Sequence, residues 1–500
     1  MLDFAIIAAG EGSRLKSEGI STPKPLIELD GKPLIERLLT VFLKHTPNSV
    51  SIIVNKNMTE LAKYLRSLIL PCQLNIIEGS TPSSLHSFGE LSRFISAEKF
   101  CLTTVDTVFR ENEFNDFINV FCNDETNDGL FAVTKYIDDE KPLYIAVNKD
   151  DNTVSGFFDT PVHEAKFVSG GIYALKSAKA LSILQNALSD GVSHLRNYQR
   201  RLIDEGLKIK AFKFGKIIDI DHASDIAKAE KLVQPIKMIA IEREKCFSPG
   251  HITTDAAILK HTIKYLKNKN CQINVCTEKE FCSTNPDADL IFGMARSKPT
   301  IERLKTAQQQ GIKVINSGFG IENCTRTKMV DILLKNGIPY PATRIISTDN
   351  LMTNTDFPQK GCWVKKGSPN TNEEDVVHAN SKEQLSKIIK DFKDKNISNA
   401  IINEHLDGDL IKFYGVGDDF FYWFYPESNK NNGIEFDKEY FKQICRKAAH
   451  LLDVKIYGGD CIVNVDGNFS IIDFNDWPSF AVCCDEAAQA IADCIYEFAE

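Results

Sequence analysis

A glycine-rich segment, an arginine and a lysine stand close together near the N-terminus. Residues 8–14 (Ala-Ala-Gly-Glu-Gly-Ser-Arg) directly follow the first apolar run, and residues 23–26 (Pro-Lys-Pro-Leu) come soon after. Glycines let a backbone approach a ligand closely, and exposed amides with a basic side chain hold phosphate groups. A glycine-rich turn between a strand and a helix is also common without a ligand. The candidate nucleotide-binding and catalytic residues are Ala9, Gly10, Gly12, Arg14 and Lys24.

Acidic residues follow two apolar strands in the same half of the chain. Residues 100–105 form an apolar run that ends at Asp106, and residues 217–221 (Ile-Ile-Asp-Ile-Asp) precede a helical stretch. Magnesium prefers hard oxygen ligands and accompanies substrate phosphates, so carboxylates that converge from distant strands suit it. A single aspartate at a strand end can equally be a cap. Asp106, Asp219 and Asp221 are the candidates for this role.

A third set of polar residues lies near the C-terminus. Asp473 and Asn475 alternate along an apolar strand, so both side chains point to the same face of the sheet. Buried there, they would leave polar groups unpaired without a ligand. The segment of residues 466–467 (Asp-Gly) is typical of a hairpin turn that joins this strand to the one before it. This pattern predicts a ligand site on an antiparallel strand pair.

Composition limits the class of protein. Five hundred residues exceed what one core usually organises, and 43% hydrophobic with 25% charged residues is ordinary for a soluble globular protein. A net charge of -9 argues against a nucleic-acid or anionic-membrane partner. No apolar stretch approaches the roughly 20 residues of a membrane helix, and the N-terminus lacks a signal peptide. The 14 cysteines are scattered, which favours reduced thiols and a cytoplasmic location.

The elements that must position these residues follow from hydrophobic periodicity. Short apolar runs at 4–9, 51–54, 74–77, 100–105 and 129–133 predict strands, and residues 33–43 and 58–68 have helical spacing. Strands separated by helices predict a mostly parallel sheet. The series closes with a helix near 226–233, and a new strand begins at Lys237. We therefore expect domains at 1–235, 236–324 and 325–500 in an α/β protein.

The N-terminal motifs resemble those of the sugar-nucleotide pyrophosphorylase and phosphocholine cytidylyltransferase-like superfamily, although the Pro-Leu-Thr common between Arg14 and Lys24 is missing. The resemblance implies a Rossmann-like, GT-A-like mixed sheet. It also implies attack by a substrate phosphate on the α-phosphorus of a nucleoside triphosphate, with release of pyrophosphate. Asp106 and Asp219 would bind magnesium, and Asp221 is the alternative candidate to Asp219. Thr81 and Ser83 would recognise the base, or form an ordinary turn with a helix cap, and Gly170 and Gly171 would bind the acceptor. The Asp-Ile-Asp sequence at residues 219–221 favours CTP over UTP as the nucleotide substrate.

The C-terminal motifs resemble an ATP-grasp domain preceded by a pre-ATP-grasp domain, an α+β fold. Such domains begin with a lysine and a helix, followed by a segment like residues 337–341 (Gly-Ile-Pro-Tyr-Pro). The resemblance implies that Lys328 and Lys365 hold ATP phosphates and that Glu404 lies on the strand that meets adenine. It also implies a magnesium triad of Asp460, Asp473 and Asn475.

The function of this second half has three possible interpretations. Residues 473–480 (Asp-Phe-Asn-Asp-Trp-Pro-Ser-Phe) and the segment around Lys412 resemble the inositol polyphosphate kinase branch, in which Lys412 would steady the transferred phosphoryl group. The ligase branch, which joins a carboxylate to an amine, has a similar strand, and a non-catalytic regulatory module is the third alternative. We expect a bifunctional enzyme that uses Mg²⁺, a nucleoside triphosphate and ATP on a small phosphorylated substrate. The oligomeric state is left open.

Overall fold

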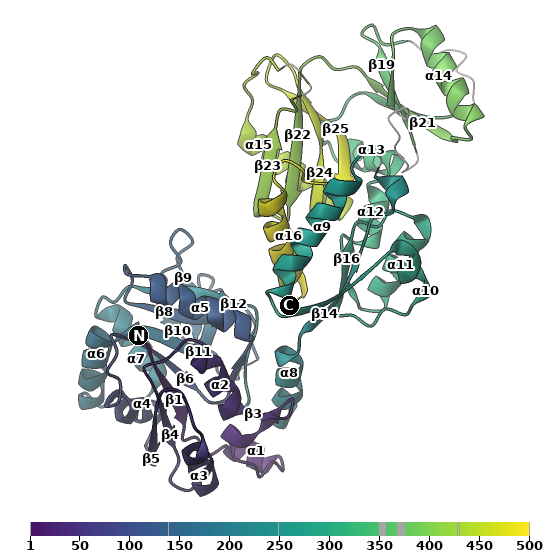
Figure 1. Ribbon diagram of the computed structural model, residues 1–500. Helices are drawn as coiled ribbons and strands as arrows, with labels where there is room; N and C mark the ends of the chain where they lie inside the picture. Colours follow the sequence, from purple (N-terminus) through teal and green to yellow (C-terminus); the bar gives the residue numbers. More distant parts are fainter. Residues whose placement is uncertain are drawn as a thin grey trace. The chain divides into compact units, whose positions relative to one another are not determined.

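The computed structural model describes residues 2–138, 140–248, 250–349, 357–367, 376–427, 429 and 431–499. The chain divides into two compact units, Met1–Pro235 and Ile236–Glu500. Each unit has its own sheets and its own apolar cores, and each is described by itself (Figure 1). Within the described residues, no helix combines the length and apolar character needed to cross a membrane.

The first unit is built on a nine-stranded mixed sheet. Its strands are β1 Leu2–Ala8, β4 Ser49–Val54, β5 Gln73–Glu78, β6 Lys99–Thr104, β8 Gly129–Thr134, β9 Tyr144–Val147, β10 Val154–Phe158, β11 Phe167–Lys176 and β12 Ile209–Phe214. The main path runs β10-β9-β11-β6-β1-β4-β5, and β8 pairs with β11 and β12. Strands β6, β1, β4 and β5 are mutually parallel, whereas β11 runs antiparallel to β6. The mixed α/β fold expected for this half is confirmed.

Helices cover both faces of this sheet (Figure 1). They are α1 Ser13–Ser17, α2 Leu34–Leu43, α3 Thr59–Ser67, α4 Ser84–Ser92, α5 Glu111–Asn123, α6 Ser177–Ser189, α7 Leu195–Asp204 and α8 Ala223–Val233, with the 3-10 turn η1 Lys24–Leu26. Phe4 and Ile6 of β1 enter the core with α2, α3, α5 and α8. Ala5 and Ile7 enter the opposite core with α4, α6 and α7. A strand buried on both faces reads as a continuous apolar run, which is why β1 was visible in the sequence.

Two short ribbons complete the first unit. β2 Glu28–Leu29 pairs with β3 Lys32–Pro33, and β7 Thr107–Phe109 pairs antiparallel with β13 Ile217–Asp219. The β7–β13 ribbon brings the acid-bearing segments of the sequence together, because Asp219 lies opposite Thr107.

The second unit begins with a parallel sheet. Its strands are β14 Ile236–Ile241, β15 Cys271–Cys276, β16 Leu290–Gly293 and β17 Lys313–Ile315, in the order β15-β14-β16-β17. The accompanying helices are α9 Ile252–Lys267, α10 Glu278–Ser283, α11 Lys298–Gln309, α12 Gly318–Asn323 and the C-terminal α16 Cys484–Ala499, with the 3-10 turn η2 Lys245–Phe247. Helices α9 and α16 pack in one core of this sheet, and α10 and α11 in the other.

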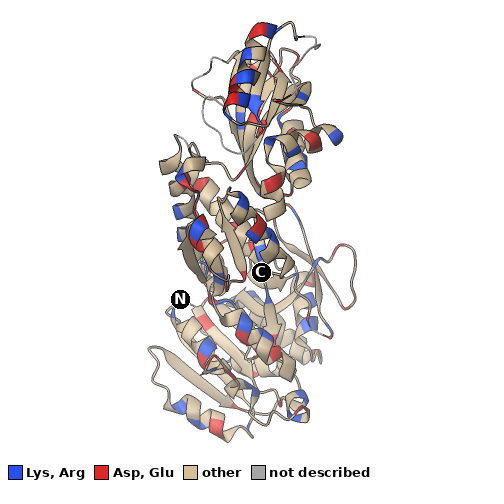
Figure 2. Ribbon diagram, turned by 90° about the vertical axis from the view of Figure 1, so that its right-hand side faces the viewer, with Lys and Arg blue, Asp and Glu red and all other residues tan. Residues whose placement is uncertain are grey.

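Two antiparallel sheets follow in the second unit. The first contains β18 Thr343–Ser347, β19 Cys362–Lys366, β20 Val376–Ala379 and β21 Asn399–Glu404, covered by α14 Lys382–Asp394. The second contains β22 Asp409–Val416, β23 Phe420–Phe424, β24 Ile456–Val463 and β25 Phe469–Asp476, covered by α13 Arg326–Lys335 and α15 Lys438–Leu452. Basic and acidic residues are interspersed along α14 (Figure 2), as on a solvated helix face. The predicted strand pair near the C-terminus is confirmed as β24–β25.

Candidate active sites

The first site is organised around the Lys24 ammonium group. Lys24 begins η1, and its Nζ donates to Asp106 Oδ2 at 2.6 Å and to Asp221 Oδ1 at 2.9 Å. The lysine side chain is only 11% exposed. Burial alone would lower the pKa of Lys24, but the charges and hydrogen bonds of the two carboxylates outweigh it and raise that pKa above 10.5. Residues far apart in the sequence thus converge on one cation.

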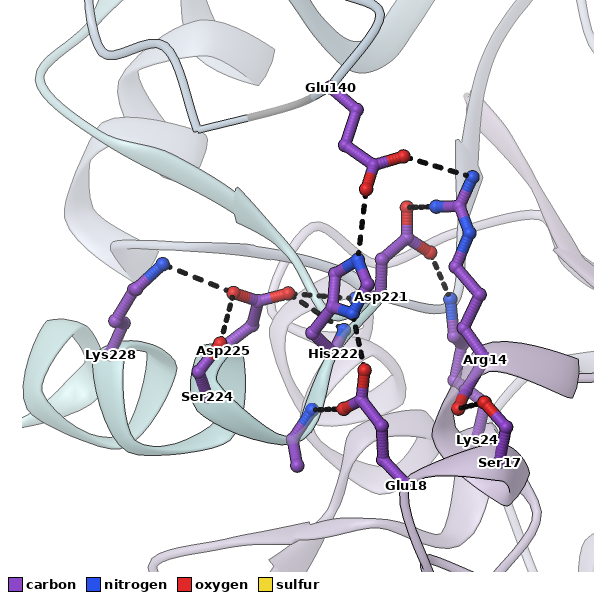
Figure 3. Close-up of polar contacts among 11 residues, drawn as sticks. Arg14, Ser17, Glu18, Lys24, Glu140, Asp221, His222, Ser224, Asp225 and Lys228 are labelled. Atoms are coloured by element: carbon purple, nitrogen blue, oxygen red, sulfur yellow. Dashed lines mark hydrogen bonds and ion pairs between the residues drawn. The ribbon is translucent and has the colours of Figure 1, made fainter.

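Arg14 adds a second cation on the solvent side (Figure 3). Its Nη1 lies 3.0 Å from Asp221 Oδ2, and its Nη2 lies 3.5 Å from Glu140 Oε2. Asp221 therefore bridges Arg14 and Lys24. The backbone N–H of Asp221 donates to Asp225 Oδ2 at 3.2 Å, so the first turn of α8 holds the bridging residue in place.

Asp219 is held differently from Asp221. It ends β13, and its Oδ1 accepts a hydrogen bond of 2.9 Å from Thr107 Oγ1, which also contacts Thr104 Oγ1 at 2.7 Å. The sequence placed Asp219 ahead of Asp221 as a metal ligand. The structure instead groups Asp221, the reserve candidate, with Lys24 and Asp106.

The glycine-rich loop and the predicted base-recognition loop have clear local roles. Gly12 caps α1 with φ of 60°, a left-handed conformation that glycine adopts at little cost. Gly10 and Ala9 precede it, and the Ala9 carbonyl accepts from Asn55 Nδ2 at 3.3 Å. Ser83 caps α4, the alternative that the sequence left open, and Thr81 Oγ1 contacts Ser87 Oγ at 2.6 Å. Their contact with a nucleotide stays a prediction.

The predicted acceptor segment lies beside the same group of acids. The β11–β8 pairing becomes irregular between Ser169 and Tyr173, which is where Gly170 and Gly171 lie. Gly171 has φ of 71°, and a Cβ atom there would stand 3.0 Å from Thr107 Oγ1. A pocket opens next to this bulge. It is lined by Ser169, Arg14, Tyr136, Asp219, Asp221 and His222, among others.

The second site lies on the β24–β25 strand pair. Asp460 and Asp473 are register partners, and Asn475 Nδ2 is 3.5 Å from Asp473 Oδ2. Lys412 Nζ on β22 donates to Asp460 Oδ1 at 3.0 Å. Lys365 Nζ on β19 reaches across from the other antiparallel sheet and donates to the Ile472 carbonyl at 2.6 Å. Two sheets therefore contribute to one polar site.

The two carboxyl groups of this site differ in electrostatic environment. Burial raises the pKa of Asp460 above 3.8, and the Lys412 charge opposes this only in part. Burial also acts to raise the pKa of Asp473, but the charges of Arg326 and Lys365 outweigh it and lower that pKa. Burial lowers the pKa of Lys365 below 10.5. The site concentrates buried cations around Asp473.

Arg326 is a site residue that the sequence analysis missed. Its guanidinium is 11% exposed, 3.9 Å from Asp473 Oδ2, and donates to the Lys366 carbonyl at 3.4 Å. Lys328, the predicted phosphate-binding lysine, is half exposed and pairs with Glu322 instead. Helical residues two positions apart point about 200° apart, so only one of the pair faces inward. The sequence carried a signal for this residue, because Arg326 lies three and seven positions before the buried Met329 and Leu333 and therefore on the same face of the helix.

Glu404 ends β21, opposite Cys362, and is exposed. It directly precedes His405, whose Nδ1 lies 3.0 Å from Trp363 Nε1. The structure therefore places Glu404 at a strand end near exposed aromatic rings, and its contact with adenine stays a prediction.

Comparison with known proteins identifies the first unit. Residues 5–234 match the family model described as nucleotidyl transferase. The N-terminal unit is a nucleotidyltransferase domain. Among curated proteins, it is 28% identical to the choline-phosphate cytidylyltransferase of Streptococcus pneumoniae, over 46% of this chain and 97% of that protein. It is 24% identical to the bifunctional protein GlmU of Methanococcus maripaludis, over 46% of this chain and 53% of that protein. The chain thus spans about half the length of GlmU relatives.

Solved structures also resemble parts of this chain. The inositol-1-phosphate CTP transferase from T. maritima covers 46% of this chain and 97% of its own, at 22% identity and a TM-score of 0.39. The D-alanine--D-alanine ligase from Bacillus anthracis covers 53% of this chain and 97% of its own, at 15% identity and a TM-score of 0.41.

The donor atoms at both sites fit magnesium. In the nucleotidyltransferase domain, Asp106 and Asp221 already share one cation, the Lys24 ammonium group, and their carboxylate oxygens are of the kind that magnesium binds. In the second unit, Asp460 and Asp473 are register partners, and the Asn475 side chain lies next to Asp473. Across the part of the chain that the structure describes, no group of three or more His, Cys, Asp or Glu residues is arranged to hold a metal. Magnesium would take its remaining ligands from water and substrate phosphates, as it commonly does.

Proposed function

We propose that the chain is a bifunctional enzyme. Its nucleotidyltransferase domain transfers a nucleotidyl group, with CTP preferred over UTP, to a small phosphorylated alcohol and releases pyrophosphate. Its second unit is an ATP-grasp kinase that phosphorylates a small hydroxyl substrate. The observation that carries the first activity is the convergence of Lys24, Asp106 and Asp221 in a domain of this family. Similar proteins are named for choline phosphate and inositol 1-phosphate, which supports a phosphorylated alcohol as acceptor.

In the first reaction, an acceptor phosphate oxygen bonds to the α-phosphorus while the α–β bridging bond breaks and pyrophosphate leaves. Arg14 and Lys24 neutralise the negative charge that builds up on the triphosphate. Bound magnesium would add Lewis-acid stabilisation of the same phosphates, held by Asp106 and Asp221. The pocket beside Gly170 and Gly171 would receive the acceptor, because it opens directly next to Asp221.

In the second reaction, buried cations hold the triphosphate of ATP. Arg326 and Lys365 both lie beside Asp473, and Lys412 lies beside Asp460. This arrangement supports a phosphate-binding site, since two partly buried carboxylates beside three cations are suited to bind a metal that carries phosphates. The substrate hydroxyl would approach Lys412, which steadies the transferred phosphoryl group. A kinase followed by a nucleotidyltransferase forms a logical sequence, because the first step supplies the phosphate that the second one uses.

One assay separates the two activities and their alternatives. The full chain is incubated with magnesium, CTP, UTP or ATP, and a panel of free and phosphorylated polyols, sugars and amino-alcohols, with pyrophosphate and ADP measured separately. We expect pyrophosphate with CTP and a phosphorylated alcohol, and ADP without inorganic phosphate when a free alcohol is supplied with ATP. Hydroxamate formation in the presence of hydroxylamine, or ADP and phosphate only with a carboxylate and an amine, would assign the second unit to the ligase class. Absence of any turnover by that unit would favour a regulatory module.

A further inference from the structure

One face of the β23-β22-β24-β25 sheet carries an ordered row of side chains across all four strands. Phe424 pairs with Lys412, Lys412 with Asp460, and Asp460 with Asp473. Paired residues project to the same face of an antiparallel sheet. The row therefore runs from an aromatic ring at the β23 edge to the buried carboxylate at the β25 edge.

The next row on the same face also begins with an aromatic residue on β23 and ends with a polar residue on β25. Tyr422 pairs with Tyr414, Tyr414 with Gly458, and Gly458 with Asn475. A Cβ atom on Gly458 would stand 2.8 Å from Tyr414 Cδ1, so the tyrosine ring occupies the space over this glycine. Phe424, Tyr422 and Tyr414 thus gather at the β23–β22 side of the face, whereas Lys412 on β22, Asp460 on β24, and Asp473 and Asn475 on β25 are its polar members.

The aromatic side forms a continuous surface. Ring centroids of Tyr414 and Phe424 are 5.7 Å apart, and those of Tyr422 and Phe424 are 5.9 Å apart. Tyr422 is 39% exposed. The alternate residues of β23, Phe421 and Trp423, pack into the core on the opposite face. Among the described residues, Tyr422 and Phe424 join none of the apolar cores, whereas Tyr414 packs against the core that contains Phe480.

The phosphate-holding groups lie at the far edge of the same face. Lys365 contacts the backbone of β25, and Arg326 lies beside Asp473 on β25. Adjacent strands are about 4.8 Å apart, so Phe424 on β23 stands roughly 10 Å from Asp460 and roughly 14 Å from Asp473. A ring-sized molecule resting on the aromatic side would meet Lys412 with its inner edge.

We propose that Tyr414, Tyr422 and Phe424 form the platform on which a neutral cyclic polyol or sugar stacks as the phosphoryl acceptor of the second unit. The inference rests on the proposed kinase function. The C–H face of such a ring carries slight positive charge and fits the negative face of an aromatic ring. Its hydroxyl groups at the inner edge then reach Lys412. Lys412 pairs directly with Phe424 and disfavours a cationic acceptor at this place, although cations also bind aromatic faces.

The proposed phosphoryl transfer from ATP to the acceptor balances in atoms and electrons. The acceptor hydroxyl oxygen bonds to the γ-phosphorus of ATP, and the bond between that phosphorus and the β–γ bridging oxygen breaks. ADP leaves with the electron pair, and the hydroxyl proton passes to water. The platform supplies orientation, which is the main contribution that a protein makes to phosphoryl transfer.

The test uses the full chain and two independent readouts. Binding of myo-inositol, glucose and glycerol is measured by ligand-detected NMR with magnesium and a non-hydrolysable ATP analogue, and ADP formation with the same compounds is measured with ATP. We expect a cyclic compound to bind more tightly than glycerol. In Tyr422→Ala and Phe424→Ala the dissociation constant and KM for that compound should rise about 10-fold or more, with ATP affinity changed less than twofold. Tyr422→Phe retains the ring and should restore binding, and Tyr440→Ala, an exposed tyrosine on α15, is the matched control.

The outcomes test the aromatic platform and the kinase activity separately. If wild-type protein binds the cyclic compound and the alanine variants bind it equally well, the platform is wrong. Tighter binding of choline or of a nucleoside than of any cyclic polyol or sugar would also overturn it, as would no measurable binding of any polyol. If binding is lost in the alanine variants but wild-type protein forms no ADP, the platform stands and the kinase proposal fails. Unfolding of an alanine variant is detected by its melting curve, and the comparison then rests on Tyr422→Leu and Phe424→Leu.

Discussion

At the scale of single residues, the first candidate site depends on which aspartate faces Lys24. Asp106 and Asp221 share Lys24, whereas Asp219 is tied to Thr107. A carboxylate that binds both the lysine and a phosphate-bound metal contributes charge that an amide cannot replace. The side chain that bridges two cations should therefore matter more than its neighbour two residues away.

We predict that Asp106→Asn and Asp221→Asn each lower the rate of pyrophosphate release by about 100-fold or more, since a lost electrostatic contact at a transition state costs that much. Asp219→Asn should have a smaller effect, because an amide oxygen still accepts from Thr107. The measurement is steady-state pyrophosphate release with CTP and a phosphorylated alcohol, and Asp204→Asn on α7 serves as the exposed control. If Asp219→Asn and Asp221→Asn lower the rate of pyrophosphate release equally, the contact with Lys24 does not decide which aspartate matters more.

A second residue-scale prediction compares Arg326 with Lys328. Arg326→Met should weaken ATP binding to the second unit about 10-fold or more, because the guanidinium lies beside Asp473. Lys328→Met should leave ATP affinity within about twofold, because this lysine contacts Glu322 near the surface. Calorimetric titration with ATP and magnesium measures both variants. The reverse ranking would restore Lys328 as the phosphate-binding residue.

At the scale of elements, β1 is fixed at its start by a buried carboxylate. Asp3 accepts hydrogen bonds from the backbone N–H groups of Ser96 and Ala97 at 2.7 and 2.6 Å, and from Asn48 and Ser49 at 2.9 and 2.8 Å. Burial acts to raise the pKa of Asp3, but these hydrogen bonds outweigh it and lower that pKa below 3.8. One side chain thereby ties β1 to β4 and to the segment before β6, the strand that leads to Asp106.

This pKa direction gives a stability prediction with a definite sign. A carboxyl group with a lowered pKa in the folded state contributes stability above its unfolded value of 3.8, and that contribution is lost as pH falls through the folded pKa. Asp3→Asn should cost about 3 kcal/mol at neutral pH, because two backbone N–H groups lose a charged acceptor. The difference in melting temperature from wild type should shrink below pH 3.8. A difference that is the same at pH 7 and pH 3 would argue against an ionised Asp3.

At the scale of the whole molecule, the cores of the two units are composed of separate residues. Among the residues that the structure describes, the first unit contains two cores, one on each face of its nine-stranded sheet, and the second contains four. The chain passes from one unit to the other between Pro235 and Ile236. A segment that buries its own cores is expected to fold without the rest of the chain.

We predict that fragments 1–235 and 236–500 each fold alone, and that the first retains pyrophosphate release while the second retains ATP binding. Each fragment should unfold cooperatively on heating, which circular dichroism measures. The full chain, assayed beside them, is the reference for activity. A first fragment that is insoluble or lacks a cooperative transition would mean that it needs the second unit to fold.

The sequence by itself determined much of this protein. Strands buried on both faces, such as β1 and β4, are mostly apolar in sequence, because neither of their faces meets water. The glycine-rich loop, Lys24 and Asp106 could be selected as candidates, because phosphate chemistry needs particular residue types at particular strand ends; the structure brings Lys24 and Asp106 together, and their role stays a prediction. The β24–β25 pair could also be predicted, since the hairpin turn and the alternation of Asp473 with Asn475 are local features.

Only the tertiary structure decided which candidates meet. Asp221 rather than Asp219 reaches Lys24, because β13 pairs with β7 and Thr107 holds Asp219. Arg326 rather than Lys328 reaches Asp473, because the packing of α13 turns one face of that helix toward β25. The row from Phe424 to Asp473 exists only because β22 pairs with β24, which joins two strand pairs, β22–β23 and β24–β25, that are distant in sequence. Strand register and helix rotation depend on long-range packing, and residue types along a chain do not specify which distant side chains that packing brings together.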